Sequence, residues 1–249
     1  MTLRAVYFDL DDTLCGYWGA SKAALRETFA LHPVAGHSVD EMFEHWARAF
    51  RRFSVSLKET GWYERYCKEG EPTRTEQMRL TLEEAGVQDE SLARTLGDTY
   101  AEIRDRNLEL FDDAISVLDA LSARYPLGLI TNGPADIQRQ EIATLGIESY
   151  FRHIFIEGEM GVGKPHEIVF ERAASAVGAQ PHELLIVGNS YGHDIRPAVE
   201  LGWHTAWIRR ESDVAPSRTK PESKPEGAPD PSIEIGSLSE LLDFIGPEE

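Results

Sequence analysis

Short apolar runs alternate with helical patterns through the second half of the chain. The runs predict strands at LGLIT (127–131), HIFIE (153–157), LLIVG (184–188) and HTAWI (204–208). The third run is apolar on both of its alternating faces, which is typical of a strand that is covered on both sides. Because strands separated by helices form βαβ units, this alternation predicts a parallel sheet with helices packed on its faces.

The first half of the chain has a different sequence pattern. A short apolar run at residues 3–8 predicts one more strand of the same sheet, but the following stretch up to about residue 105 has only helical patterns. An all-helical block therefore interrupts the core after its first strand. We expect two domains: a helical domain over residues 15–105, and a core made of residues 1–14 and 106–249.

Capping residues indicate where two of the helices in this block begin. Ser38 with Glu41, and Thr73 with Glu76, have the spacing of a capping box. The second of these helices is expected to end at Gly86, since glycine is common just past a helix end.

A proline-rich stretch separates the last part of the chain from the rest. Residues 211–231 are rich in proline and charged residues and poor in apolar ones, which predicts a solvated, mobile loop. The segment IEIGSLSELLDFI (233–245) then predicts an edge strand and a last helix that return to the core.

Charge and composition exclude several classes of function. The 249 residues include 43 acidic and 25 basic ones, for a net charge of −18, and such a field repels nucleic acid and anionic membranes. No apolar stretch is long enough to cross a bilayer. Two cysteines, Cys15 and Cys67, are too few for a disulfide scaffold and lack zinc-ligand spacing. We expect a cytoplasmic protein, a monomer or homodimer, that binds neither nucleic acid nor membranes.

Polar side chains gather where the predicted strands end. The positions are Asp9 and Asp11 after the first strand, Thr131, Asn132 and Gly133 after the second, Lys164 in the loop after the third, and Asn189 and Asp194 after the fourth. Ligands of open parallel sheets bind at the carboxyl ends of the strands, so these groups should converge on one crevice. Neighbouring carboxylates raise each other's pKa unless a cation accompanies them. The sequence therefore predicts a Mg²⁺ site with a lysine opposite.

These residues carry a resemblance to a known family. DLDDT (9–13), TNG (131–133), GKP (163–165) and GNSYGHD (188–194) are similar, in order and placement, to the four motifs of the haloacid dehalogenase superfamily, whose members are mostly phosphatases. A helical insertion after the first motif resembles the subfamily that includes phosphoglycolate phosphatases and β-phosphoglucomutases. The resemblance implies an α/β fold: a Rossmann-like, three-layer parallel sheet core with an inserted all-helical cap domain.

The resemblance also implies a role for each motif residue. Asp9 would be the nucleophile that forms an aspartyl-phosphate, Asp11 the general acid and base, and Lys164 the cation that binds both the nucleophile and the phosphoryl group. The implied substrate-binding residues are Thr13, Thr131, Asn132 and Gly133, and the implied Mg²⁺ ligands are Asp9, Asp11, Asn189 and Asp194. Asp12 is expected to take no part, because its side chain should leave the strand end opposite to that of Asp11.

One position departs from the family pattern. The fourth motif usually begins Gly-Asp, whereas this chain has Gly188-Asn189. An asparagine carbonyl can bind Mg²⁺ but brings no charge, so we expect a higher magnesium requirement than in a relative with aspartate there.

The implied function is a Mg²⁺-dependent phosphohydrolase that acts on a small phosphorylated metabolite. A sugar-phosphate mutase, a phosphonate hydrolase and a non-catalytic phosphate-binding relative remain alternatives, the second of which would need a cap lysine such as Lys22 or Lys58. Asp11 disfavours a dehalogenase, since that branch lacks the second aspartate. The length and the cap disfavour a receiver-type signalling domain.

The helical domain should determine the substrate. Tyr17 and Trp18 follow the first motif and are expected at the hinge of this domain. Arg48, Arg51 and Arg52 share one helix face, which is either a solvated basic surface or a binding site for a substrate carboxylate.

Overall fold

A six-stranded parallel sheet forms the centre of the core. The computed structural model describes residues 2–57 and 61–246. The strands are β1 (Ala5–Phe8), β2 (Leu127–Thr131), β3 (Phe151–Ile156), β4 (Leu184–Gly188), β5 (His204–Ile208) and β6 (Ile233–Ile235). They lie in the order β3-β2-β1-β4-β5-β6, and all neighbouring strands are parallel. The predicted parallel α/β sheet is confirmed.

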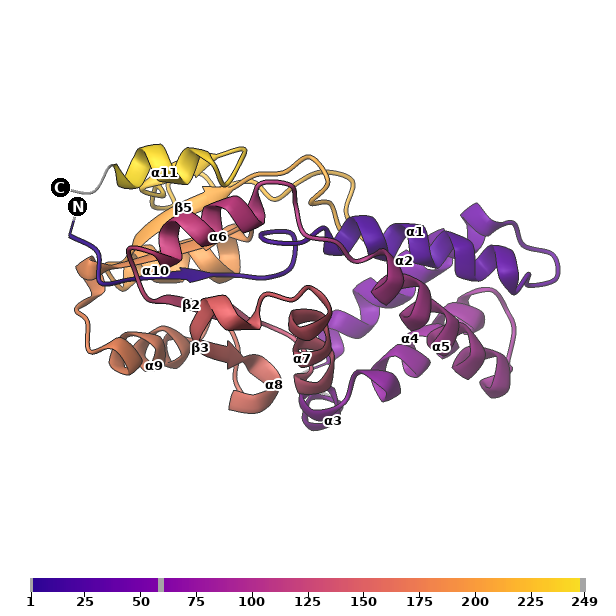
Figure 1. Cartoon of the computed structure of the whole chain (residues 1–249). Helices are drawn as coiled ribbons and strands as arrows, with labels where there is room; N and C mark the ends of the chain where they lie inside the picture. Colours follow the sequence, from indigo (N-terminus) through magenta and orange to yellow (C-terminus); the bar gives the residue numbers. More distant parts are fainter. Residues whose placement is uncertain (1, 58–60, 247–249) are drawn as a thin grey trace.

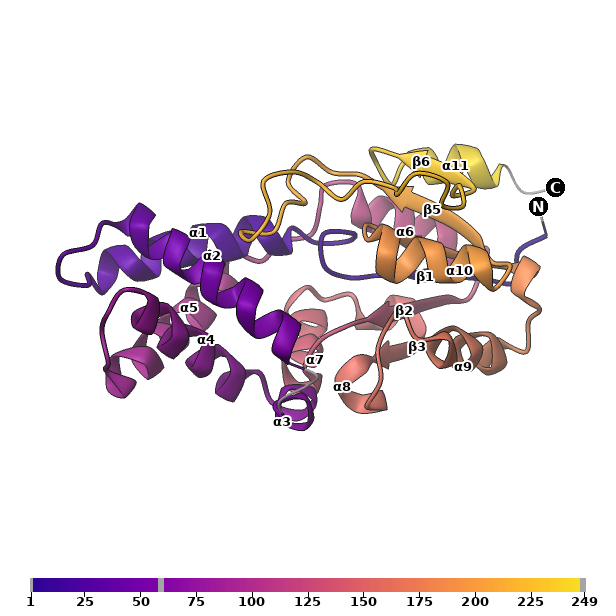
Figure 2. The ribbon, with the colours of Figure 1, turned by 180° about the vertical axis from the view of Figure 1, so that it is seen from behind.

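Helices cover both faces of the sheet, as its alternating side chains require. Val6 and Phe8 of β1 pack on one face with residues of α6 (Ala114–Ser122), α7 (Ala135–Thr144) and α11 (Glu240–Ile245). Ala5 and Tyr7 pack on the other face with α9 (Glu167–Val177) and α10 (Arg196–Glu200). Figures 1 and 2 show these layers from opposite sides. The three-layer core is thus as predicted.

The connections contain several short helical turns as well. They are α8 (Glu157–Met160), the 3₁₀ turns Glu148–Tyr150 and Pro181–Glu183, and a π-helical turn at Tyr191–Ile195. The last of these follows β4, and π turns of this kind occur often at functional sites.

The predicted helical insertion follows β1 and has a core of its own. It consists of α1 (Tyr17–Leu31), α2 (Val39–Ser56), α3 (Tyr63–Lys68), α4 (Gly70–Glu84) and α5 (Glu90–Asn107). Four of these helices lie together at one end of the molecule, and α3 lies next to α7 and α8 of the core (Figure 1). Trp46, Met78 and Leu96 are among the buried side chains that join four of these helices. None of the helices in the part of the chain that the structure describes is long and apolar enough to cross a membrane.

One of the two predicted capping boxes is wrong. Ser38 and Glu41 form theirs at the start of α2, but α4 begins at Gly70, ahead of Thr73. The Gly70 amide donates to the carboxylate of Asp136 in α7, so the core supplies the acceptor that a local capping residue would have supplied. Thr73 is buried inside the helix, and its hydroxyl donates to the Gly70 carbonyl oxygen.

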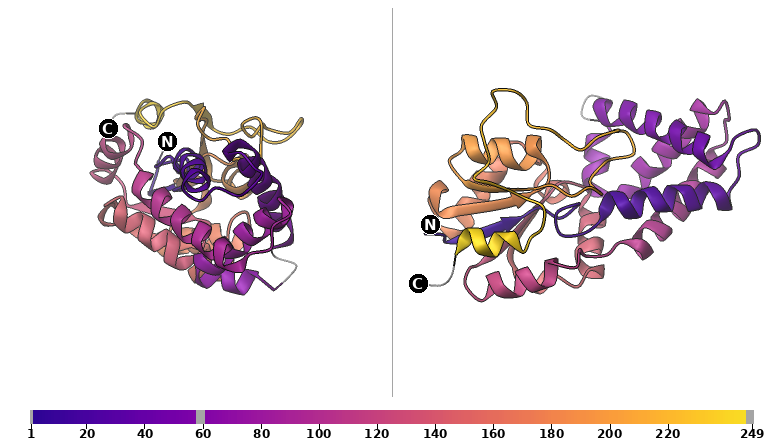
Figure 3. Two further views of the ribbon diagram at one scale, coloured as in Figure 1. Left: turned by 90° about the vertical axis from the view of Figure 1, so that its right-hand side faces the viewer. Right: turned by 90° about the horizontal axis from the view of Figure 1, so that it is seen from above.

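Residues between β5 and β6 form the long connection predicted from the proline-rich stretch. It has no helix or strand, but it extends along the core toward α1, as the gold trace in Figure 3 shows. There the Lys22 side chain in α1 donates to the Ser212 carbonyl oxygen at 3.5 Å.

Gly128 in β2 is required by the packing of Tyr7. A β-carbon at this position would lie 2.2 Å from Cε1 of the Tyr7 ring, which is fully buried and donates its hydroxyl to the Ala173 carbonyl oxygen at 2.7 Å. We expect Gly128→Ala to lower the free energy of unfolding by about 1–3 kcal/mol, because the ring must move in a close-packed core. Urea unfolding measures this.

Gly19→Ala is the matched control. This glycine lies in α1, and a β-carbon added to it would meet no other atom within 4 Å. Its substitution should therefore leave stability unchanged or raise it by up to about 1 kcal/mol. Equal stability of the two variants would contradict the packing argument.

Candidate active site

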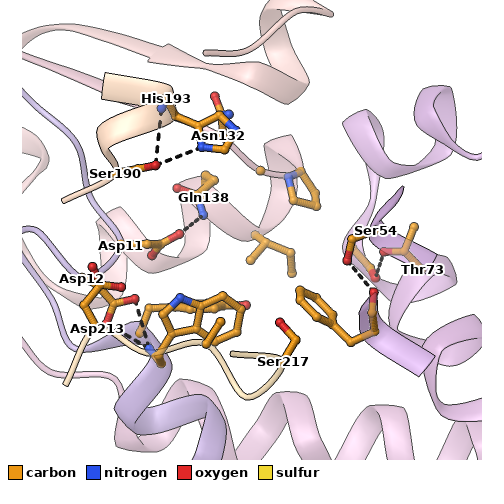
Figure 4. A pocket seen from close by; sticks show the side chains of 18 of the residues that line it. Asp11, Asp12, Ser54, Thr73, Asn132, Gln138, Ser190, His193, Asp213 and Ser217 are labelled. Atoms are coloured by element: carbon orange, nitrogen blue, oxygen red, sulfur yellow. Dashed lines mark hydrogen bonds between the residues drawn. The ribbon is translucent and has the colours of Figure 1, made fainter. Parts of the chain in front are cut away.

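A cavity of about 670 Å³ lies between the carboxyl ends of the strands and the helical insertion. This is the edge where β1 has β2 on one side and β4 on the other, the point at which strand order reverses. Three parts of the chain line the cavity: the strand-end loops of the core with the helices that follow them, the helices of the insertion, and the connection between β5 and β6. Figure 4 shows side chains from all three. Its volume suits a small ligand.

Lys164 lies between two buried carboxylates at the bottom of this cavity. Its Nζ donates to Asp9 Oδ1 at 2.7 Å and forms an ion pair with Asp194 Oδ1 at 2.6 Å. Nζ also donates to the Ile130 carbonyl oxygen at 2.7 Å. All three charged side chains are at most 9% exposed. The structure therefore brings together residues that are 155 and 30 positions apart in sequence, as their strand-end placement predicts.

Asp11 lies beside Asp9 and faces the core helix α7. Its Oδ2 accepts a hydrogen bond from Gln138 Nε2 at 3.3 Å (Figure 4). The same amide nitrogen donates to Glu141 Oε2 at 2.8 Å. Burial, and next the charge of Asp9, raise the pKa of Asp11 to about 7, so this carboxyl group exchanges a proton near neutral pH.

The pKa values of Asp9 and Lys164 are both shifted by burial and by neighbouring charges. Burial raises the pKa of Asp9 to about 6; Lys164 lowers it, and Asp194 adds repulsion. Burial opposes the charge of Lys164, but Asp194 and Asp9 together raise the pKa of this lysine, so it stays protonated. One fixed cation thus faces several acidic groups, an arrangement that favours a second positive charge.

Asp12 has a structural role that the sequence did not reveal. It is fully buried, has a φ of 59°, and accepts hydrogen bonds from the Trp18 amide at 3.1 and 3.3 Å. It therefore holds the beginning of α1, the first helix of the insertion. Its side chain also lines the cavity, next to Asp213 (Figure 4).

Of the second-motif residues, Thr131 supports neighbouring side chains, whereas Asn132 and Gly133 line the cavity. The Thr131 hydroxyl is buried and donates to Gln138 Oε1 at 2.5 Å, while Asn132 exchanges two 2.8 Å hydrogen bonds with the main chain of Lys164. Asn132 and Gly133 line the cavity, whereas Thr131 does not. Gly133 has a φ of 146°, a conformation that favours glycine.

Thr13 and Asn189 lie next to Asp9, and Asn189 lines the cavity whereas Thr13 does not. The Thr13 hydroxyl donates to Asp9 Oδ2 at 2.9 Å and lies 3.5 Å from Asn189 Oδ1. Asn189 Nδ2 donates to Asp213 Oδ2 at 2.9 Å. Asp213 belongs to the connection between β5 and β6, so the stretch predicted as a solvated loop contributes directly to the site.

The donor atoms around Asp9 are of the kind that binds Mg²⁺. Nowhere in residues 2–57 and 61–246 do three or more His, Cys, Asp or Glu side chains form a metal-binding group. However, the Asp9 and Asp194 carboxylates both contact Lys164 Nζ, and the Asn189 amide oxygen lies 3.5 Å from the Thr13 hydroxyl that donates to Asp9, so hard oxygen ligands lie close together. Mg²⁺ needs few protein ligands because it retains waters. The residues present therefore fit this ion.

Several lining residues were not singled out from the sequence. Gln138, His193 and Tyr66 line the cavity, as do Arg74 and Arg104 of the insertion. Burial, and next the charge of Lys164, lower the pKa of His193. Only the HD pair within GNSYGHD could have pointed to His193, while Gln138 lies in an ordinary amphipathic pattern.

The predicted cap residues differ in where they lie. Tyr17 and Trp18 line the cavity. Of the three arginines on α2, Arg51 lines it, whereas Arg48 and Arg52 both pair with Glu84 on the surface. Lys22 contacts Ser212, and Lys58 falls outside the described residues.

The raised pKa of Asp11 predicts how stability depends on pH. The pKa of Asp11 is near 4 in the unfolded chain and about 7 in the folded protein, so between pH 4 and pH 7 the folded state binds the Asp11 proton more tightly than the unfolded state does. Ionised Asp11 therefore costs stability, and the cost appears as the pH rises through this window. In metal-free buffer, Asp11→Asn should match the wild type at pH 4 and exceed it by about 2–3 kcal/mol at pH 8. Urea unfolding across this range is the measurement.

Asp98→Asn provides the comparison for this experiment. Asp98 is exposed on α5, and its substitution should change stability by less than about 0.5 kcal/mol. A stability difference for Asp11→Asn that stays constant with pH would refute the assignment of a raised pKa.

Comparison with known proteins gives the site a family context. A family description, "Hydrolase: haloacid dehalogenase-like hydrolase", matches residues 3–202. The chain is 30% identical to a phosphoserine phosphatase from Thermus thermophilus, over 96% of this chain and 98% of the relative. It is 29% identical to a glyceraldehyde 3-phosphate phosphatase from Methanopyrus kandleri (98% and 97% covered) and 28% identical to a mouse N-acylneuraminate-9-phosphatase (85% of each).

Solved structures share the fold. The putative HAD-hydrolase YfnB from Bacillus subtilis, in a magnesium-bound crystal form, superposes with a TM-score of 0.75 at 21% identity, over 99% of this chain and 100% of that one. A 2-haloacid dehalogenase from Pseudomonas syringae has a TM-score of 0.64 at 26% identity, with 98% of each chain covered. The match over residues 3–202, together with the Asp9, Lys164 and Asp194 cluster at its strand ends, shows that this chain belongs to the haloacid dehalogenase-like hydrolases.

Proposed function

We propose that this hydrolase is a Mg²⁺-dependent phosphatase that acts on a small phosphorylated metabolite through an aspartyl-phosphate at Asp9. The observation that carries the proposal is the contact of Lys164 Nζ with Asp9 Oδ1 at 2.7 Å, at the bottom of a covered cavity and beside Asp11. A carboxylate that is held by a fixed cation can approach an anionic phosphoryl group, which a free carboxylate would repel.

The residues around Asp9 support a two-step reaction. An Asp9 carboxylate oxygen attacks phosphorus, and the bond from phosphorus to the ester oxygen breaks. Asp11, whose pKa is raised to about 7 by burial, protonates the departing oxygen through its carboxyl group. The same carboxylate then takes a proton from the water that hydrolyses the aspartyl-phosphate, which regenerates Asp9 and releases phosphate.

The other motif residues hold these groups in place. Thr13 donates to Asp9 Oδ2 and so fixes the rotation of the nucleophile. Asn132 binds the main chain of Lys164 on both sides, which fixes the base of the lysine side chain. Lys164 neutralises negative charge as the phosphoryl group approaches.

Mg²⁺ would be held by the Asp9 carboxylate, the Asp11 main-chain carbonyl, Asn189 Oδ1 and Asp194. When bound, it supplies positive charge to the phosphoryl oxygens. The excess of buried carboxylates over cations at this place supports the assignment.

Cavity size and the names of the relatives support a small phosphorylated substrate. The relatives above are named as phosphatases of phosphoserine, glyceraldehyde 3-phosphate and N-acylneuraminate 9-phosphate. A cavity of about 670 Å³ beneath a helical insertion admits compounds of this size and keeps out a folded protein.

Hydrolytic dehalogenation is the second candidate, because one structure at 26% identity is a 2-haloacid dehalogenase. Asp11 disfavours it. An alkyl halide needs no proton for its leaving group, whereas a phosphate ester does, and the structure places a carboxyl group with a raised pKa beside Asp9.

Hydrolysis of an aryl phosphate tests the proposal, with the wild type and Asp9→Asn assayed with and without Mg²⁺. We expect turnover that requires Mg²⁺ and falls by roughly a thousandfold or more in Asp9→Asn, since the amide cannot attack phosphorus. Asp98→Asn is the control and should keep wild-type activity. A panel of phosphorylated metabolites and a 2-haloacid assay for halide release complete the experiment. Halide release without phosphate release, or equal phosphate release by Asp9→Asn, would overturn the proposal.

A further inference from the structure

Asn189 brings a neutral side chain to a position where the family pattern has a charged aspartate, and both its side chain and its main chain make defined hydrogen bonds. Its Nδ2 donates to Asp213 Oδ2 at 2.9 Å. Its main-chain carbonyl oxygen accepts a hydrogen bond from Trp207 Nε1 at 2.8 Å, which anchors the backbone. A carboxylate can only accept hydrogen bonds, so the amide nitrogen must point toward Asp213. The amide oxygen then points the other way.

That other direction leads to the nucleophile. Asn189 Oδ1 lies 3.5 Å from the Thr13 hydroxyl oxygen, which donates to Asp9 Oδ2. Without Asp213, nothing in this set of contacts would distinguish the two ends of the amide, and a 180° flip would place an NH₂ group where an oxygen ligand is needed. Asp213 thus selects the orientation in which Asn189 offers oxygen to the site.

The connection that carries Asp213 is anchored at both ends of this segment. On one side, Arg210 pairs with Asp113 at 2.8 Å and donates to the Thr13 carbonyl oxygen at 3.4 Å. The Asp213 amide donates to the Arg210 carbonyl oxygen at 3.1 Å, so a short turn ties the carboxylate to this anchor.

On the other side, Glu222 binds the loop that follows Asn189. Its carboxylate accepts hydrogen bonds from the Ser190 hydroxyl at 2.9 Å, the Tyr191 amide at 3.2 Å and the Gly192 amide at 3.0 Å. The segment that carries Asp213 is therefore tied to the core before it, through Arg210, and after it, through Glu222.

We propose that Asp213 is a positioning residue for the divalent cation of this site: it orients the Asn189 amide and supplies, from behind it, the negative charge that Asn189 lacks. The inference rests on the proposed Mg²⁺-dependent function. A carboxylate separated from the cation by one amide group still attracts it, and a hydrogen bond from the amide NH₂ to that carboxylate makes the amide oxygen more negative. The Asn189–Asp213 pair would then do what a single aspartate does, with Asn189 supplying the ligand oxygen and Asp213 the negative charge.

Direct measurement of Mg²⁺ binding to the full chain tests this, by isothermal titration calorimetry in phosphate-free buffer. Asp213→Asn keeps an acceptor for the Asn189 amide but removes the charge, and should weaken Mg²⁺ binding about tenfold. Asp213→Ala also removes the acceptor and should weaken it further.

Exchanging the two residues gives the decisive variant. Asn189→Asp combined with Asp213→Asn restores the charge and the hydrogen bond with their roles reversed, so Mg²⁺ affinity should return to within about threefold of the wild type. Asp230→Asn is the matched control: it lies on the same connection, is exposed and pairs with Lys224, and should leave Mg²⁺ affinity unchanged. Urea unfolding in metal-free buffer verifies that each variant is folded.

The possible results separate this inference from the proposed function. If the wild type binds Mg²⁺ and hydrolyses phosphate esters but Asp213→Asn binds Mg²⁺ equally well, the inference is wrong and the proposed function stands. A double variant no better than Asp213→Asn also overturns the inference, since a merely structural loss would not be rescued by exchange. If the wild type neither binds Mg²⁺ at millimolar concentration nor hydrolyses phosphate esters, both are overturned.

Discussion

The ion cluster of Lys164 with Asp9 and Asp194 is the interaction on which the rest of the site depends. All three side chains are almost completely buried, and the lysine lies within 2.7 Å of an oxygen of each carboxylate. Removing one member would leave an uncompensated buried charge, which costs several kcal/mol. The attraction within such a cluster offsets the cost of burying the charges only if the fold holds its members rigidly. Here the three members come from three separate strand-end loops. The sheet order that places β1 between β2 and β4 provides that rigidity.

The positions of Asp9, Lys164 and Asp194 could be predicted because they follow from the sheet. Once the strands are recognised as parallel, their carboxyl ends must meet at one edge, whatever the details of the side chains. The helical insertion was predictable for a similar reason, since helical periodicity is a local signal. The error at Thr73 shows the limit of such signals: a neighbouring element, through Asp136, supplied the capping acceptor and moved the helix start to Gly70.

Gln138 and Asp213 could not be predicted, because their roles exist only in the assembled structure. Gln138 lies in a helix with an ordinary pattern, and its importance comes from Thr131, Asp11 and Glu141, which surround its amide. Asp213 belongs to a stretch whose composition predicts a loop without structure. Composition indicates how much apolar surface a segment can bury by itself. It does not show that the Asp213 and Glu222 carboxylates, which stand on irregular backbone, accept hydrogen bonds from Asn189 and Gly192 of the core.

The helical insertion reaches the acid and base through buried polar contacts. Arg104, near the end of α5, is 2% exposed and lies 3.4 Å from Glu141 Oε1 in α7. Glu141 in turn shares the Gln138 amide with Asp11. Arg104 is buried in the boundary between the insertion and the core, and it keeps α5 against α7. Separating Arg104 from Glu141 would leave a buried charged group without its partner, which costs free energy. The Asp11 carboxyl group is thus connected, through Gln138 and Glu141, to the place where α5 of the insertion meets α7 of the core.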